Sequence, residues 1–143
     1  MYTDAVLKFS DAQALTGTAV STNVIDLGVD RDIGIGEAMC LAVFVGVAAD
    51  YTTTDETYQF ILQTDDNEAF SSATTVIASA AIPGNQLTLG AVVALPIGFT
   101  NERYLRVNNV LAGTTPTITI DAFLMPLADV AGYNRYASGY TIS

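Results

Sequence analysis

The chain has 143 residues, half of them hydrophobic, and its 15 acidic side chains against five basic ones give a net charge of −10. That length fits one ordinary domain, which buries enough surface to fold without disulfides or a metal. The acidic balance argues against a nucleic-acid partner, which requires a basic surface, and against binding to an anionic membrane. The large hydrophobic share suggests that some apolar surface meets a partner.

Neither a signal peptide nor a membrane span is predicted. Residues 1–4 lack the basic stretch followed by an apolar core that marks a signal peptide. The longest apolar run, residues 38–49, is too short to span a bilayer and suits a buried strand. We therefore expect the protein to be made and used in a cytoplasm, without secretion.

Strand-like segments make up the first half of the chain, separated by Gly, Pro, Asn and Asp residues that favour turns. Residues 9–28 predict a short strand, a turn of small residues and a second strand. Residues 40–47 are apolar on both faces, which predicts a central strand covered on both sides. Residues 57–64 alternate large apolar residues with polar ones, and residues 68–72 are compatible with one helical turn.

The second half continues in the same way. Residues 74–81 predict a strand that ends at a Pro-Gly-Asn turn, and residues 86–95 predict another strand with its leucines on one face. Residues 103–111 and 117–125 flank a Gly-Thr-Thr-Pro turn, so we expect them to pair as a hairpin.

These segments predict an all-β protein, an antiparallel jelly-roll sandwich of about eight strands with an extended C-terminal tail. An immunoglobulin-like sandwich is the alternative topology. The predicted domain covers residues 1–127, and the tail covers residues 128–143.

The tail differs in kind from the rest of the chain, because it sets Tyr133, Arg135, Tyr136 and Tyr140 among small residues. Tyrosines in such a setting make an adaptable contact surface. We expect these four side chains, together with an N-terminal arm of residues 1–10, to contact a partner. The alternative is a tail that packs on its own domain or is frayed.

The residue types that most catalytic sites need are missing. The chain has no His and no Trp, a single cysteine, Cys40, and a single lysine, Lys8. Without His there is no Ser-His or Cys-His nucleophile and no usual zinc site, and no glycine-rich phosphate-binding motif is present. Cys40 lies in an apolar run and is expected to be a buried, inert thiol. We therefore predict no catalytic residue, no cofactor and no metal centre.

Acidic residues in the loops leave two alternatives open. A His-free glycosidase would use two of them as catalytic carboxylates, and a cation would need several of their oxygens close together. The candidate cation ligands are Asp30 with Asp32, and Asp65 with Asp66 and Glu68, against the simpler interpretation of acidic turns. The candidate catalytic acids are Asp50, Asp55, Glu56, Asp65, Asp66, Glu68 and Glu102.

Three stretches, in this order, carry a resemblance to a known family. The first reads FSDAQ and then STNVIDLG within residues 9–28, and it continues as DIGIGE over residues 32–37. The second is LQTDDNEAF over residues 62–70, and the third is NERYLRV over residues 101–107. With these stretches the chain resembles the jelly-roll capsid cement (decoration) proteins of short-tailed bacteriophages. The resemblance does not extend to the tail.

The resemblance implies a viral structural protein on the exterior of the virion, assembled in the host cytoplasm. Such proteins bind as small symmetric homo-oligomers across junctions between subunits of the major capsid protein. They reinforce the shell against internal DNA pressure and do no chemistry, so the family offers no catalytic residue to carry over. The alternative function is a jelly-roll carbohydrate-binding module, in which tyrosines would take the place of the missing tryptophans.

Overall fold

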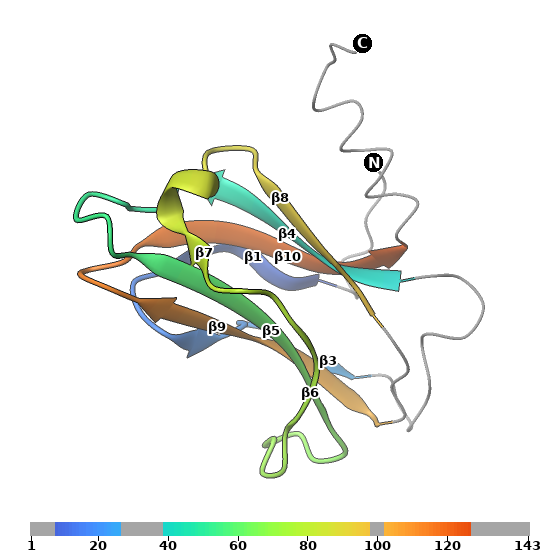
Figure 1. The fold of residues 1–143 in the computed structure, drawn as a ribbon. Helices are drawn as coiled ribbons and strands as arrows, with labels where there is room; N and C mark the ends of the chain where they lie inside the picture. Colours follow the sequence, from blue (N-terminus) through green and yellow to red (C-terminus); the bar gives the residue numbers. More distant parts are fainter. Residues whose placement is uncertain (1–7, 27–38, 98–101, 127–143) are drawn as a thin grey trace.

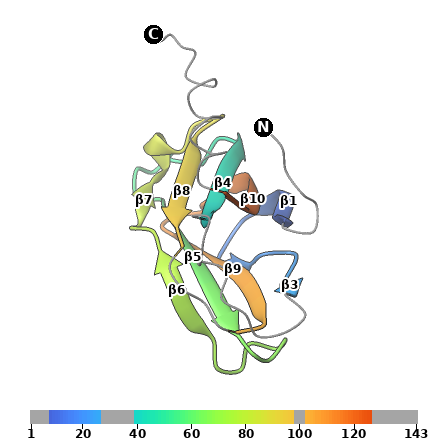
Figure 2. The same cartoon turned by 90° about the vertical axis from the view of Figure 1, so that its right-hand side faces the viewer.

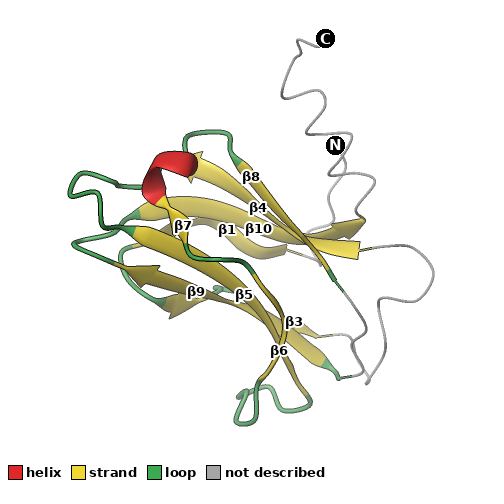
Figure 3. Cartoon of the chain, viewed as in Figure 1, coloured by secondary structure: helices red, strands yellow, loops and turns green. Residues whose placement is uncertain are grey.

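The computed structural model describes residues 8–26, 39–97 and 102–126 (Figure 1). Its elements are β1 (Lys8–Leu15), β2 (Ala19–Val20), β3 (Ile25–Asp26), β4 (Met39–Val47), β5 (Thr57–Asp65), β6 (Thr74–Ala78), β7 (Ile82–Pro83), η2 (Gly84–Gln86), β8 (Val92–Pro96), β9 (Tyr104–Ala112) and β10 (Ile118–Pro126). In this part of the chain η2, one turn of 3-10 helix, stands among strands (Figure 3), and no helix is long and apolar enough to cross a membrane. The predicted tail and the predicted boundary at residue 127 lie outside the described residues.

The strands form two antiparallel sheets that pack face to face (Figure 2). One sheet has the order β1-β10-β4-β8, and the other has the order β2-β9-β5-β6, with β3 also paired to β9 and β7 also paired to β5. Because β2 and β3 both pair with β9, and β6 and β7 both pair with β5, each sheet has four strand positions side by side. In both sheets, strands from the first half of the chain (β1 to β5) alternate with strands from the second half (β6 to β10). That arrangement is the topology of a jelly roll, so the predicted all-β jelly-roll sandwich is confirmed.

The main core lies between the sheets and follows from the alternation along the strands. On β5, Tyr58, Phe60 and Leu62 have no exposed surface, whereas the residues between them remain partly exposed. The Tyr58 hydroxyl donates to the backbone oxygens of Asp50 at 2.7 Å and Thr117 at 3.2 Å, which satisfies the polar end of this buried ring.

The strand predicted to be central is β4, and the structure confirms its central position and the burial of both faces over residues 40–43, whereas Gly46 and Val47 at its end are exposed. β4 lies between β10 and β8. Leu41, Val43 and Val45 on one face belong to the main core, and Cys40 and Ala42 on the opposite face are also fully buried.

The predicted hairpin of residues 103–111 and 117–125 is wrong. In the described residues β9 pairs with β5 in one sheet, and β10 pairs with β1 and β4 in the other. The inward faces of both strands, with Val107 and Ile120 as examples, meet in the main core from opposite sides. Apolar and polar residues alternate in the same way whether two consecutive strands pair as a hairpin or lie in different sheets. The sequence pattern therefore did not distinguish these two arrangements.

The predicted strand over residues 86–95 is too long. The chain first makes η2 and then a turn, in which the Ala91 N–H donates to the Thr88 oxygen at 2.9 Å and Gly90 has a φ of +87°. The strand begins only at Val92. Leu89, expected on the same strand face as the other leucines, lies in this turn and is 72% exposed.

Residues 68–72 form turns, so the predicted helical turn is not found. The preceding Asp65 carboxylate accepts from the N–H of Asn67 at 3.2 Å and from the N–H of Ser72 at 2.7 Å, which folds the segment around one side chain. The strand predicted over residues 74–81 is shorter, β6, and the chain returns to the same sheet as β7.

Candidate interaction surfaces

The residues predicted to contact a partner fall almost entirely outside the described part of the chain. This holds for residues 1–7 of the N-terminal arm and for Tyr133, Arg135, Tyr136 and Tyr140. Residues 8–10 of the arm begin β1, where Phe9 and Ser10 have no exposed surface. This end of the arm therefore belongs to the sandwich.

Two loop acids that were candidate catalytic residues accept hydrogen bonds from turns, Asp50 from its own turn and Asp55 from its own turn and from the turn between β9 and β10. Asp50 Oδ1 accepts from the N–H of Thr52 at 3.1 Å and from its hydroxyl at 2.5 Å. Asp55 accepts from the Thr53 hydroxyl at 2.6 Å, and from the Thr114 N–H at 3.1 Å and hydroxyl at 3.0 Å. These bonds, the one from Thr53 first, hold the pKa of Asp55 below its usual value.

A third acid, Glu56, is fully buried next to the turn between β9 and β10. Its Oε2 accepts from the hydroxyl and the N–H of Thr53, while its Oε1 has no hydrogen-bond partner. A Cβ added to Gly113 would lie 2.7 Å from the Glu56 Cα, so the two loops are in close contact. A carboxyl group enclosed in this way offers no surface that a substrate could reach.

Asp65, Asp66 and Glu68 were the first candidate set of cation ligands, and the structure gives Asp65 other partners. Both carboxylate oxygens of Asp65 accept from backbone N–H groups, and the bond from Ser72 is the main cause of its lowered pKa. Nowhere in residues 8–26, 39–97 and 102–126 do three or more His, Cys, Asp or Glu side chains gather to hold a metal. The other candidate pair, Asp30 and Asp32, lies outside these ranges.

A second apolar cluster lies on the side of the β1-β10-β4-β8 sheet that faces away from the main core, and its members are buried. It consists of Cys40 and Ala42 on β4 and Phe123 and Met125 on β10, and we call these four residues the outer cluster. The Phe44 ring packs at its rim, 5.6 Å from the Phe123 ring between centroids. Burial raises the pKa of the Cys40 thiol to about 11, so this cysteine is an inert thiol, as predicted.

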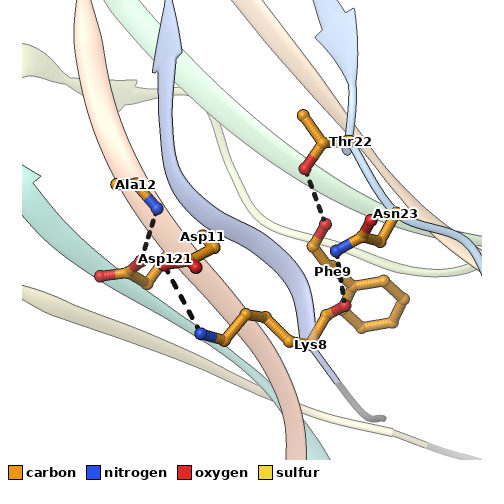
Figure 4. Close-up of polar contacts among 7 residues, drawn as sticks. All are labelled: Lys8, Phe9, Asp11, Ala12, Thr22, Asn23 and Asp121. Carbon is orange, nitrogen blue, oxygen red and sulfur yellow. Dashed lines mark hydrogen bonds and ion pairs between the residues drawn. The ribbon is translucent and has the colours of Figure 1, made fainter. Parts of the chain in front are cut away.

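The margin of the outer cluster along β1 is charged (Figure 4). The Lys8 ammonium lies 5.3 Å from the centroid of the Phe123 ring and 3.5 Å from a carboxylate oxygen of Asp11. Next to them, the N–H of Ala12 donates to Asp121 Oδ1 at 2.7 Å and ties β1 to β10. The close-up also shows Thr22 and Asn23 bonded to the backbone oxygens of Phe9 and Lys8, which fixes the start of this strand.

The second surface feature is polar and lies on the outer face of the other sheet. Gln59 and Gln63 on β5 and Arg106 and Asn108 on β9 point outward and remain partly exposed, and we call them the amide face. Arg106 Nε donates to Gln63 Oε1 at 2.8 Å, which connects the two strands. The charged residues of β5 and β9 are Asp65, at the end of β5, and Arg106, so this face has little charge on a strongly acidic protein.

The sequence pattern did not predict a third surface feature, the exposed apolar side chains of Val47 and Leu89. Val47 is 58% exposed and Leu89 is 72% exposed, near the end of β4 and in the turn before β8. Val47 lies opposite Thr119 and Val45 lies opposite Ile120, so the register shifts between these two pairs and Gly46 is an extra residue. This irregularity turns Val47 outward. The outer cluster did have a sequence signal, namely the apolar residues on the second face of β4.

The fold and its surfaces define the class of protein: an antiparallel jelly-roll sandwich with one apolar and one amide-rich outer face. The chain belongs to the Bbp16 family, a phage-associated family whose sequence profile matches residues 9–124. The match begins in β1 and ends in β10, so it covers nearly the whole sandwich. No curated protein matches the chain.

Proposed function

We propose that the protein is a capsid cement protein, a viral structural protein that binds the outer surface of a tailed-phage head and stabilises the shell. The observation that carries this proposal is the match to a phage-associated family over residues 9–124, which spans the jelly roll. In this proposal the partner is the major capsid protein, the protein self-associates as a homo-oligomer, and it is located on the virion exterior after assembly in the host cytoplasm.

The mechanism is mechanical reinforcement by several modest contacts. A sandwich whose loops are bonded to one another, as Asp55 is to Thr114, holds its surface in one shape, so little ordering is needed on binding. When one copy or one oligomer touches several capsid subunits, the later contacts form at high effective concentration, and retention on the shell becomes tight. An interface of about 1,200–2,000 Å² in total is sufficient.

Among the described surfaces, the amide face has the composition that best suits a protein partner. The cores of protein interfaces contain few Lys, Glu and Asp residues and are enriched in Arg and aromatic residues. Arg106 and the neighbouring Tyr104 meet this description on a face that otherwise carries amides and apolar side chains. The predicted tail contacts, Tyr133, Arg135, Tyr136 and Tyr140, belong to the same proposal.

The test is co-sedimentation of the purified protein with cognate phage heads that lack it. We expect saturation at a copy number set by icosahedral symmetry. No binding to intact heads at micromolar protein would contradict the proposal. If the acidic charge steers attachment to a basic patch, the bound fraction falls as salt rises, whereas apolar attachment is insensitive to salt.

Two full-length variants then test the contact surfaces. One replaces all four tail residues with serine (Y133S, R135S, Y136S, Y140S), and the other is Arg106→Ser on the amide face. Thr75→Ala, an exposed position on β6, is the matched control. We expect each of the first two variants to weaken binding about tenfold or more and the control to bind as the natural protein does. Unchanged binding by a variant removes that surface from the proposal.

A second candidate function, a carbohydrate-binding module, is favoured by one observation. Tyr104 is partly exposed on the same side of β9 as Arg106 and Asn108, with the Arg103 guanidinium carbon 5.0 Å from its ring centroid, and aromatic rings together with amide groups are a usual means of holding sugars. Saturable binding in a glycan screen, lost in Tyr104→Ala, would support this function. The combination of no glycan binding with saturable head binding would exclude it in favour of the cement role.

A further inference from the structure

One side of the sandwich is built from segments without a charged residue. Residues 69–101, which include β6, β7, η2 and β8, contain no Asp, Glu, Lys or Arg, although the net charge of the protein is −10. β6 and β8 are edge strands of the two sheets, and they lie next to each other. Figure 2 shows β6, β7 and β8 along one side of the sandwich and β1 and β3 along the other. A long uncharged stretch of an acidic chain is thus gathered on one side.

On this side, β8 is the most regular of the described edge strands. At the opposite edge of the same sheet β1 shifts its register twice, and β6 shifts once against β5. β2, β3 and β7 have two residues each. In contrast, β8 pairs with β4 without a shift, from Val92 opposite Phe44 to Pro96 opposite Cys40. Bulges, charges and very short strands protect sheet edges from other strands, and among such devices β8 has Pro96 at its end.

The backbone of β8 directs alternate residues toward β4 and away from it. The Ile97 N–H donates to the Met39 oxygen at 2.9 Å, so the odd-numbered residues of this segment bond to β4. Val92 and Ala94 therefore direct their N–H and C=O groups away from β4, where no described strand pairs with them. Pro96 fits this arrangement, because a residue without an N–H is tolerated on the open side of an edge strand.

The side chains along this edge leave it accessible. Ala94 and Pro96 are exposed, and Val92 is partly exposed where it packs against the outer cluster. Leu89, in the turn before the strand, is 72% exposed. An edge with open backbone groups and small or apolar side chains is the kind of site to which another strand adds.

The charge of the protein favours a second copy of the same chain as the added strand. Two strongly acidic molecules repel each other, and the repulsion is smallest when they meet through sides that carry no charge. A basic partner would instead be drawn to the acidic parts of the surface. At the opposite edge of the sheet, Lys8, Asp11 and Asp121 would bring like charges together if two copies met there.

We propose that β8 pairs antiparallel with β8 of a second copy of this chain, which joins the two β1-β10-β4-β8 sheets into one across a two-fold axis at Ala94. In this register the Ala94 N–H of each copy donates to the Ala94 oxygen of the other. Each Val92 N–H donates to the Pro96 oxygen of the other copy. Pro96 has no N–H to donate in return, so the pairing ends at this residue.

This inference deepens one part of the proposed function and rests on it in that respect, because the cement role includes self-association. It names the surface through which two copies meet. The amide face lies on the other sheet, so the pairing leaves that face free for a different partner.

The first experiment is sedimentation equilibrium of the full-length protein over the micromolar range, in which we expect a dimer. Ala94→Lys places a charge from each copy at the two-fold axis, so we expect its dissociation constant to rise about tenfold or more. Ala14→Lys is the matched control, because Ala14 is an exposed alanine on β1, the opposite edge strand of the same sheet. The control should dimerise as the natural protein does.

A second measurement covers the case in which the lysine disturbs the fold. Ala94→Cys and, as its control, Ala14→Cys are oxidised in full-length protein and analysed by non-reducing electrophoresis. Cα atoms that face each other in a hydrogen-bonded antiparallel pair lie about 5.5 Å apart, which is within the range of a disulfide. Cys40 is buried and is left in place. We expect disulfide-linked dimers from Ala94→Cys and far fewer from the control.

Three results would overturn the proposal: a natural protein that stays monomeric throughout the micromolar range, an Ala94→Lys variant that dimerises as tightly as the natural protein, or equal amounts of linked dimer from the two cysteine variants. Sedimentation with phage heads separates this inference from the cement role. A β8-linked dimer that fails to bind heads removes the cement role alone, and a monomer that saturates heads removes the pairing alone.

Discussion

The guanidinium carbon of Arg106 on β9 lies 4.4 Å from the centroid of the Phe70 ring in the turn after β5. Phe70 has a φ of +54°, a conformation that costs an ordinary residue about 1 kcal/mol or more. The ring is 7% exposed, and Arg106 also bonds to Gln63. Arg106 therefore holds a strained turn against the amide face.

We expect Arg106→Met to lower the free energy of unfolding by about 0.5–1 kcal/mol, because it keeps the apolar stem and removes the charge over the ring. Arg106→Lys keeps the charge without the planar stacking group, and its loss should be intermediate. Urea unfolding measures both values. A double-mutant cycle with Phe70→Leu should show coupling between the two positions, and additive losses would mean that the contact contributes nothing.

A second prediction concerns Gly113, at the turn between β9 and β10. It has a φ of +100°, and a Cβ placed there would lie 2.5 Å from the backbone oxygen of Asp55. Gly113→Ala should therefore destabilise the fold by about 2 kcal/mol or more. Gly17→Ala is the matched control, since a Cβ at that position meets nothing within 4 Å. Equal thermal midpoints for the two variants would contradict the expected close contact.

Glu56 gives a third prediction. Replacing it with Gln keeps an acceptor for Thr53 and removes a buried carboxyl group whose Oε1 has no partner, so stability should stay equal or rise. Glu56→Ala removes the acceptor as well and should cost about 1–3 kcal/mol. Chemical denaturation of the two variants side by side measures their free energies of unfolding. A Gln variant less stable than the Ala variant would refute the prediction.

The fourth prediction is a loss of stability in acid. Hydrogen bonds from Thr53 and Thr114 lower the pKa of Asp55, and the bond from Ser72 lowers that of Asp65. A lowered pKa means that the unfolded chain binds protons more readily than the folded one. The stabilisation is therefore complete above about pH 4 and is lost as the pH falls through the folded values.

Urea midpoints measured at pH 6 and at pH 2.5 should reveal this loss. The variant Asp55→Asn has no carboxylate to protonate at that position, so its midpoint should fall less than that of the natural protein over the same interval. An equal fall of the urea midpoint in the two proteins would show that Asp55 does not contribute to the acid sensitivity.

The sequence predicted the strands where alternation is strong, as around Tyr58 on β5, and the double apolar face of β4. It did not predict which sheet contains β10, because the turn at Gly113 can join two paired strands of one sheet or two strands of different sheets. It placed Leu89 in a strand, because regular spacing of leucines continues through a turn that only the neighbouring Gly90 reveals. Asp65 was a candidate cation ligand because the sequence shows an acid in a loop and does not show the backbone N–H groups that donate to its carboxylate.

The surfaces were harder to predict than the strands. The outer cluster depends on which face of β4 lies outside, and that follows from the sheet order rather than from local spacing. The amide face joins residues of β5 and β9 that are far apart in the chain. The contact residues predicted in the tail, Tyr133 to Tyr140, remain predictions.

The irregular path of β1 has a consequence for crowded conditions. Its register shifts twice, between Lys8 and Ser10 and between Ser10 and Gln13, and Ala12 takes a φ of +48°. A strand bent in this way is a poor template for another strand, because its free backbone groups do not form a regular row. Copies held side by side at high density therefore find at this edge of the sheet a poor site for strand-to-strand joining.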